Sequence, residues 1–433
     1  MPKFGKEMKE KEFTLKEGVT FINHGGYGAV PRRVQEAQKR MMDEMNSFPD
    51  LWFGRNLRLT RDETGKCIAE FRSSNTDDLI SVQNETTDLM LLGNRRQKQE
   101  EARKCVAEFV NSDPDDLVFV QNATTGINSV LKSLKLEPGD IILCTDNSYN
   151  AVKKTCENIA QVTSQKDVRT DYLALKFPIK TEDEIIEMYR EYFKTNPTVR
   201  IAVMDHITSP SAIRMPIEKL VPLCREFGVL SMIDGAHAPG HIPLNMRELD
   251  ADFYAGNLHK WLYAPRGCAL LYVKKEHQGW VKPVVTSHGH KTSFQHDFFC
   301  QGTRDETPFC VAPEAIKFYN AIGGYEIIKE YLDDLLNKAT DLLTSSWKTE
   351  KLPIPKSMEA PFMRMIQVPK LEGLSTIADG ERRIIENILN HGIICRLSYI
   401  GGKVYCRISA NIYNTEEDYQ KLCQLILNQM EKK

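Results

Sequence analysis

The residues best suited to catalysis lie between positions 229 and 261. The apolar run Val229–Ile233 is typical of a buried strand, and Asp234 follows it directly. Lys260 lies past a second short run, among aromatic and apolar residues that would lower its pKa by desolvation. A carboxylate at the carboxyl end of a parallel strand lies where α/β sheets place their ligands. The sequence could therefore bring a nucleophilic amine and a buried carboxylate to one site.

Pyridoxal 5′-phosphate needs this pair of side chains. A lysine forms a Schiff base with the cofactor, and an aspartate keeps the pyridine nitrogen protonated, so that the ring can accept electrons. The phosphate group requires a turn of small residues at a helix N-terminus. The segment from Asn122 to Gly126, Asn-Ala-Thr-Thr-Gly, has that character. We therefore expect an enzyme that holds this cofactor on Lys260.

Alternating elements are expected to position these residues. Short apolar runs alternate with helical stretches from about residue 100 to 300. The runs are Leu117–Val120, Ile141–Cys144, Ile201–Met204, Val229–Ile233 and Cys268–Val273. Such alternation predicts an α/β fold with a mostly parallel, doubly wound sheet. Helical spacing is expected at Ala312–Ala321 and Tyr325–Thr344, before a mixed region that reaches the C-terminus.

The 433-residue chain is long enough for more than one domain. We expect an N-terminal arm and helix at 1–50 that pack with the small domain. A large cofactor-binding domain is expected at 51–305, and a smaller α+β domain at 306–433. The N-terminal helix is predicted between Val30 and Ser47, because apolar residues recur there at helical spacing.

A tandem duplication interrupts the large domain. Residues 63–87 and 101–125 match at 15 of 25 positions, and the shared blocks CxAEF, DDL and VQNxTT occur in the same order. A sheet has one slot for such a helix–strand–turn unit, so we interpret 62–99 as a duplicated insertion of 100–126. The turn of the first copy carries Glu85 and Asp88, which would repel a phosphate. The second copy is therefore predicted to bind the cofactor, with the first at the edge of the domain, away from the phosphate.

The bulk properties are those of an ordinary globular protein. The net charge is −2, which predicts neither a nucleic-acid nor a membrane partner. The 11 cysteines show no metal-ligand spacing, so we expect reduced thiols, no metal site and a cytoplasmic location. The charged N-terminus is not typical of a signal peptide, and no apolar run is long enough to span a membrane.

An ordered set of motifs resembles one protein family. The motifs are FINHGGYG at 21–28, NATTGIN at 122–128, DHITSP at 205–210, IDGAHAPG at 233–240, NLHKW at 257–261, QGTRD at 301–305 and RISANIYN at 407–414. Together they resemble the class V aminotransferase family, whose members have the fold type I architecture of PLP-dependent transferases. The nearest branch resembles isopenicillin N epimerase, cysteine desulfhydrase and hercynylcysteine sulfoxide lyase. Because the motifs extend over nearly the whole chain in order, the set is specific where a single motif would be weak.

The resemblance implies a role for each matching residue. Lys260 would form the Schiff base, Asp234 would pair with the pyridine nitrogen, and His237 would lie near the phenolic oxygen of the ring. The remaining implied cofactor contacts are Ala123, Thr124, Asn257 and His259 on the phosphate, with Gly302 and Thr303 on the phosphate of a partner subunit. The last two imply a homodimer. Arg407 would bind the carboxylate of an amino-acid substrate, as a bidentate fork. Asn23 and Tyr27 would line the entrance.

The sequence departs from the family pattern in two places. Asn147 stands where the family often has a histidine, which leaves Tyr149 as the candidate for ring stacking or proton transfer, or else as a core aromatic. The duplicated unit is the second departure, and it leaves open a pseudoenzyme that acts as a binding protein.

The choice of reaction rests on one further motif. The mobile-cysteine motif of the desulfurases is absent around Cys395, which we expect in a strand. We therefore favour a carbon–sulfur lyase for cysteine or a cysteine-derived sulfoxide such as hercynylcysteine sulfoxide, an intermediate in ergothioneine biosynthesis. An amino-acid epimerase is the alternative, and an aminotransferase comes third.

Overall fold

The computed structural model describes residues 2–53, 58–59, 89–90, 94–163, 167–370, 386 and 388–431. Most of the first copy of the duplicated unit, including Glu85, Thr86 and Asp88, lies outside the described residues, so its predicted position stays a prediction. No helix in the described part of the chain is both long and apolar enough to cross a membrane.

A seven-stranded sheet forms the centre of the larger part of the molecule, with the strand order β4-β10-β9-β8-β7-β5-β6. In chain order the strands are β4 (Leu117–Val120), β5 (Ile141–Thr145), β6 (Arg169–Leu173), β7 (Val199–Asp205), β8 (Leu230–Asp234), β9 (Phe253–Asn257) and β10 (Ala269–Val273). Strands β6, β5, β7, β8 and β9 are mutually parallel, whereas β10 runs antiparallel to both β9 and β4. The predicted mostly parallel sheet is confirmed, and each of the five expected runs forms one of its strands.

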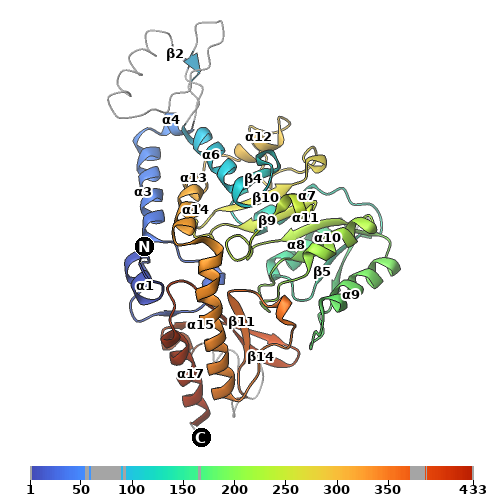
Figure 1. The fold of residues 1–433 in the computed structure, drawn as a ribbon. Coiled ribbons are helices and arrows are strands. Elements are labelled where there is room, and N and C mark those ends of the chain that lie inside the picture. The colour runs from blue at the N-terminus through green and yellow to red at the C-terminus, as the bar shows by residue number, and fades with distance from the viewer. Residues whose placement is uncertain are drawn as a thin grey trace.

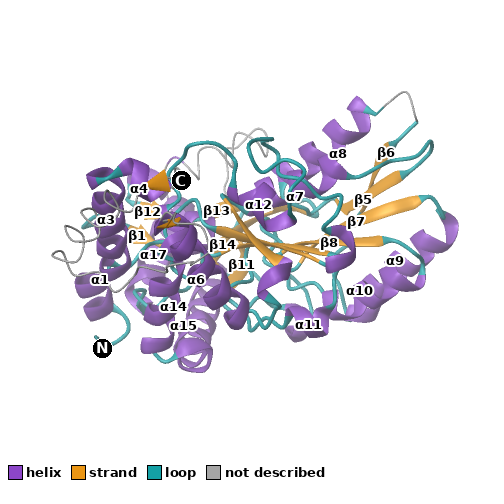
Figure 2. Cartoon of the chain, turned by 90° about the horizontal axis from the view of Figure 1, so that it is seen from above, coloured by secondary structure: helices purple, strands orange, loops and turns teal. Residues whose placement is uncertain are grey.

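Helices cover both faces of this sheet (Figure 2). One face carries α7 (Ala123–Ser133) and α8 (Asn150–Val162), and the other carries α9 (Glu182–Thr195), α10 (Ile217–Glu226) and α11 (Met246–Leu249). Alternation along the strands divides the apolar residues between two cores: Ile142 faces one core, whereas the adjacent Ile141 and Leu143 face the other. Burial on both faces explains why the strands read as continuous apolar runs.

The C-terminal part of the chain is built on a smaller sheet (Figure 1). Its strands are β11 (Met363–Gln367), β13 (Arg396–Ile400) and β14 (Lys403–Ser409), in the antiparallel order β11-β14-β13. Its long helices are α15 (Gly324–Trp347) and α17 (Glu416–Glu431). Cys395 lies between β12 (Ile393–Ile394) and β13, so the expectation that it belongs to a strand is wrong by one residue.

The N-terminal segment joins this C-terminal part. Strand β1 (Thr20–Phe21) pairs in parallel with β12, and Ser409 donates its amide hydrogen to the carbonyl of Ile22. The predicted helix appears as α3 (Arg32–Ser47), with Pro31 at its N-cap. These contacts agree with an N-terminal arm that packs against the C-terminal part, while the boundaries at 50 and 305 stay predictions.

The other elements complete the chain. The remaining helices are α1 (Lys6–Glu12), α2 (His24–Tyr27), α4 (Pro49–Phe53), α6 (Asn94–Phe109), α12 (Phe294–Phe299), α13 (Thr307–Cys310) and α14 (Ala312–Ala321), with short 3₁₀ turns at Pro114–Asp116, Lys275–His277 and Lys356–Met358. Strands β2 (Arg58–Leu59) and β3 (Leu89–Met90) form a separate antiparallel pair. The second copy of the duplicated unit supplies most of α6, β4 and the start of α7, so this copy forms part of the large sheet.

Candidate active site

Lys260 lies at the centre of a buried polar cluster. It follows the end of β9, is 9% exposed, and places its Nζ 3.1 Å from Nε2 of His237. Burial lowers the pKa of Lys260 to about 7, against the opposing attraction of Asp234, and the positive charges of Arg407 and Arg396 lower it further. A lysine with this pKa is half neutral near pH 7, so it can act as a nucleophile or a base.

Asp234 ends β8 beside Lys260, as the sequence predicts. One carboxylate oxygen, Oδ1, accepts a hydrogen bond of 3.0 Å from the amide of Ala236. Burial raises the pKa of Asp234, although this hydrogen bond and the positive charge of Lys260 act in the opposite direction. Within the described residues, no side chain donates a hydrogen bond to Asp234. The carboxylate therefore has room for a cationic partner.

His237 is fully buried in the loop that follows β8, and it contacts Lys260 from there. Burial lowers its pKa well below the usual value, and the charge of Lys260 lowers it further, so the imidazole is neutral. Trp261 lies near its Nδ1, with the indole Nε1 at 3.5 Å. A Cβ on Gly25 would lie 3.1 Å from Cε1 of the His237 ring. The residues around His237 thus hold its Nε2 beside the amine of Lys260.

A second buried aspartate, Asp205, was not among the predicted site residues. It ends β7, and its Cα is the register partner of Asp234 on the neighbouring strand. Its Oδ2 accepts a 2.8 Å hydrogen bond from Ser148 Oγ in the turn that precedes Tyr149. Burial raises the pKa of Asp205, and the negative charge of Asp234 raises it further. The signal for Asp205 was available, because aspartates that end adjacent parallel strands must lie side by side.

His24 also escaped prediction as a site residue, although it lies within a quoted motif. Its Nε2 is 2.9 Å from the carbonyl oxygen of Lys260, and its Nδ1 is 2.8 Å from the hydroxyl of Tyr413. Complete burial lowers the pKa of His24 to about 4. The nearby Gly28 (φ +70°) is required, because a Cβ there would lie 2.1 Å from the carbonyl oxygen of His259. The N-terminal motif therefore fixes the main chain that carries the lysine.

The predicted phosphate turn is held by hydrogen bonds within the protein. The amide of Ala123 donates a 2.8 Å hydrogen bond to Asn257 Oδ1, and the amide of Thr125 donates to the N-cap side chain of Asn122. The Thr124 amide has no such partner in the part of the chain that the structure describes. Ala123 and Asn257 thus bind one another, which leaves the amide and hydroxyl of Thr124 for an anion at the N-terminus of α7.

His259 is largely buried beside this turn. Its Nδ1 is 2.8 Å from the carbonyl oxygen of Cys268. Burial lowers the pKa of His259 to about 4, so the ring is neutral at pH 7. The hydrogen bond fixes one ring nitrogen to the residue that precedes β10 and orients the other.

Arg407 is the best-defined candidate for binding a substrate carboxylate. It is 2% exposed, and its guanidinium donates to the carbonyl of Ser209 and, at 2.8 Å, to Asn23 Oδ1. Its Nε has no partner, and no carboxylate forms an ion pair with it among the described residues. Burial lowers the pKa of Arg407 to about 10, and the charge of Arg396 contributes in the same direction. A buried guanidinium without a counter-charge is an anion site.

Four predicted residues lie on the surface rather than in this cluster. Tyr27 is 74% exposed, and Gly302 and Thr303 are exposed in the loop that follows α12. Tyr149, the N-cap residue of α8, is 43% exposed and is therefore not a core aromatic. It lines an open cavity of about 420 Å³ together with residues of β13.

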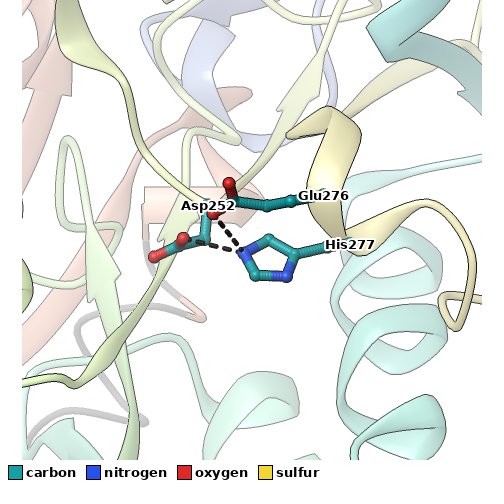
Figure 3. Close-up of side chains that lie close together, drawn as sticks. All are labelled: Asp252, Glu276 and His277. Atoms are coloured by element: carbon teal, nitrogen blue, oxygen red, sulfur yellow. Dashed lines mark hydrogen bonds and ion pairs between the residues drawn. The ribbon is translucent and has the colours of Figure 1, made fainter.

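Another group of potential metal ligands lies away from this site, at the start of β9. His277 lies between Asp252 and Glu276, with its Nε2 2.9 Å from Oδ1 of Asp252 (Figure 3). The other oxygen of Asp252 accepts hydrogen bonds of 2.8 Å from the amide and the hydroxyl of Ser231. Because protein donors already occupy both oxygens of Asp252, this group fastens β9 to β8 and carries no argument for a metal ion.

Comparison with known proteins places this arrangement in a family. The chain is 28% identical to the hercynylcysteine sulfoxide lyase of Schizosaccharomyces pombe, over 98% of this chain and 97% of that protein. It is also 28% identical to an L-cysteine desulfhydrase of Arabidopsis thaliana, over 95% of this chain and 89% of the other. The fold matches that of the cystine C–S lyase C-DES with a TM-score of 0.72 at 19% identity, over 95% and 98% of the two chains. The model of the family described as Aminotransferase class-V matches residues 81–422, and the chain belongs to this family.

Proposed function

We propose that the protein is a pyridoxal 5′-phosphate-dependent carbon–sulfur lyase that acts on a cysteine derivative by β-elimination. Family membership makes pyridoxal 5′-phosphate the cofactor. When bound, the cofactor supplies an electron sink for the electrons of the broken Cα–H bond. The observation that carries the proposal is the buried Lys260, with a pKa of about 7, between His237 and a carboxylate that lacks a cationic hydrogen-bonding partner.

The residues of the site fit the cofactor. Asp234 would pair with the protonated pyridine nitrogen, since its carboxylate is buried and needs a cation to stay ionised. The neutral His237 would face the phenolic oxygen. The Thr124 amide and hydroxyl would bind the phosphate at the N-terminus of α7, while Asn257 and Ala123 hold the turn in place. His259, held in place by the carbonyl of Cys268, would support the same turn.

Lys260 would move the proton of the reaction. With an amino-acid substrate on the cofactor, the free amine of Lys260 would accept the Cα proton, and a pKa near 7 suits this role at neutral pH. The Cβ–S bond then breaks, and its electron pair leaves with the sulfur. The sulfur group takes up a proton, for which Tyr149 is the proposed donor. The remaining 2-aminoacrylate reacts with water to give pyruvate and ammonia.

The substrate would be oriented by its α-carboxylate. Arg407 presents a buried guanidinium without a counter-charge, and Asn23 and Ser209 hold it in position. A bidentate pair with a carboxylate would satisfy the unpartnered Nε and place Cα toward Lys260. Asn23 is therefore proposed as a positioning residue for Arg407.

The choice of lyase is supported by the relatives and by the placement of cysteines. Two relatives that align over most of the chain are named for carbon–sulfur cleavage, a hercynylcysteine sulfoxide lyase and a cysteine desulfhydrase. Cys395 hydrogen-bonds with Cys406 of β14, in the small sheet. We propose hercynylcysteine sulfoxide ahead of free cysteine as the substrate. Its β-elimination releases a sulfenic acid, which a two-electron reductant such as a free thiol then converts to ergothioneine.

A homodimer in the cytoplasm completes the proposal. Gly302 (φ +88°) and Thr303 form an exposed turn with open space around the glycine, which is suited to reach the phosphate of a partner subunit. Tyr27 is exposed on the N-terminal segment and would line an entrance formed by both subunits. The cysteines of the described residues are free thiols, which agrees with a reducing compartment.

The test is the release of pyruvate and ammonia from purified protein supplied with hercynylcysteine sulfoxide or cysteine. We expect an absorbance band at about 420 nm from the lysine-bound cofactor, and its loss together with pyruvate release in Lys260→Ala. The variant Lys282→Ala is a matched control, because this lysine forms an ion pair with Asp297 away from the site. Racemisation of the substrate without pyruvate would favour an epimerase. A protein that takes up no cofactor would contradict the assignment altogether.

A further inference from the structure

A second arginine, Arg396, lies directly across the small sheet from Arg407. The two are register partners on β13 and β14, so their side chains project from the same face of the sheet. Like charges at directly opposite positions destabilise a strand pair. The effect is visible at the site, where the charge of Arg396 lowers the pKa of Arg407 and of Lys260. This arrangement indicates an anion with two negative groups, or two anionic ends of one ligand.

Arg396 has a free guanidinium. It is exposed, and no carboxylate forms an ion pair with it within the ranges that the structure describes. It lines the open cavity of about 420 Å³ that Tyr149 also lines. The other charged residues of this cavity are Asp146 and Lys153, so the three formal charges leave a net charge of +1. Lys153 donates to the main-chain carbonyl of Asp146, which leaves Arg396 as the cation without a protein partner.

The cavity adjoins the reaction site through two short segments. Ser209 binds Arg407, and the next residue, Pro210, lines the cavity. Ser148 binds the buried Asp205, and the next residue, Tyr149, also lines the cavity. A substrate whose α-carboxylate lies on Arg407 can therefore extend past Tyr149 toward Arg396.

We propose that Arg396 binds a second, distal carboxylate of the substrate, so that the enzyme acts on cysteine S-conjugates with an acidic S-substituent. The inference rests on the proposed lyase function and narrows its substrate class. Two arginines on one face then bind the two carboxylates of one molecule. Free cysteine, which has a single carboxylate, leaves Arg396 unused and is a poor substrate.

Binding and turnover are tested separately. Binding is measured on the cofactor-loaded protein by the change in cofactor absorbance with L-2-aminoadipate and with its 6-amide. Neither compound has a leaving group on Cβ, so neither can undergo β-elimination. We expect the acid to bind about 10- to 100-fold more tightly than the amide, the range expected for one charge-assisted contact. Arg396→Gln should abolish this preference, and Arg396→Lys should retain part of it.

Turnover is measured as pyruvate release from S-(2-carboxyethyl)-L-cysteine sulfoxide and from its neutral carbamoyl analogue. Arg396→Gln should lower kcat/KM for the acid about 10- to 100-fold more than for the analogue, whose smaller loss comes from the higher pKa of Lys260 in this variant. Arg190→Gln removes a surface charge that is paired with Glu226 on another helix, and it should change neither value.

The outcomes separate the inference from the proposed function. Equal affinities for acid and amide in the wild type, or equal losses for both in Arg396→Gln, would overturn the inference. Absence of pyruvate from every conjugate, with an intact acid preference that depends on Arg396, would overturn the lyase and leave the distal carboxylate site standing.

Discussion

The pKa of Lys260 makes the rate of cofactor attachment a sensitive test of the site. Burial and two arginines lower this pKa from the usual 10.5 to about 7. At pH 7 about half of the amine is therefore neutral, against roughly one part in three thousand for an ordinary lysine. Attachment of pyridoxal 5′-phosphate to the cofactor-free protein should thus be on the order of a thousandfold faster than attachment to an exposed lysine at the same pH.

The assay follows absorbance at about 420 nm after the cofactor-free protein is mixed with saturating cofactor between pH 5.5 and 9.5. Because only the neutral amine reacts, the rate should rise about tenfold per pH unit below pH 7 and level off above it. Arg396→Gln removes a positive charge that lowers the pKa of Lys260, so the midpoint should move to higher pH. Arg190→Gln serves as the control and should leave the midpoint in place. A rate that still climbs tenfold per unit between pH 8 and 9.5 would refute the reasoning.

Two further predictions concern the main chain that carries the lysine. Gly28→Ala should lower the free energy of unfolding by roughly 2–4 kcal/mol in urea titrations, because the new Cβ would collide with the carbonyl of His259. Gly18→Ala is the control: Gly18 has a similar φ but open space around it, so this substitution should lower the free energy of unfolding by only about 1 kcal/mol. The pKa of His24 is about 4 in the folded protein and about 6.5 in the unfolded chain. Between these pH values only the unfolded chain binds the extra proton, so the stability falls as the pH is lowered. Unfolding at pH 5 should cost about 2 kcal/mol less than at pH 7 on this account, and a pH dependence unchanged in His24→Gln would assign the effect to another group.

The sequence was most informative about polar residues that directly follow an apolar run. The positions of Asp234 and Lys260 at one edge of the sheet could be predicted because each follows an apolar run, and a parallel sheet brings such ends together. The large sheet was predictable for the same reason, since its strands are continuous apolar runs between helices. The hydrogen bond between Ala123 and Asn257 was not predictable, because it joins residues 134 positions apart and depends on the packing of α7 against β9.

The arginine pair shows the other limit of the sequence. Arg407 belongs to a recognisable motif. The position of Arg396 opposite Arg407, in contrast, follows only from the register of β13 and β14. A shift of one residue would turn Arg396 to the other face of the sheet, and no local pattern fixes that register. Similarly, His24 reads as one polar residue in a glycine-rich stretch, and its contact with Lys260 crosses 236 positions.

The duplicated unit shows how packing strengthens an argument first made from charge. The sequence favoured the second copy because Glu85 and Asp88 in the first would repel a phosphate. In the structure, the equivalent positions of the second copy are Ala123, which is 3% exposed, and Gly126, whose added Cβ would lie 3.1 Å from Cβ of Ala255. A glutamate and an aspartate at these positions would bury two carboxylates against apolar atoms without partners. The position of this unit, with β4 beside β10 and α7 packed on β9, therefore excludes the first copy by packing alone, whether or not a phosphate is bound.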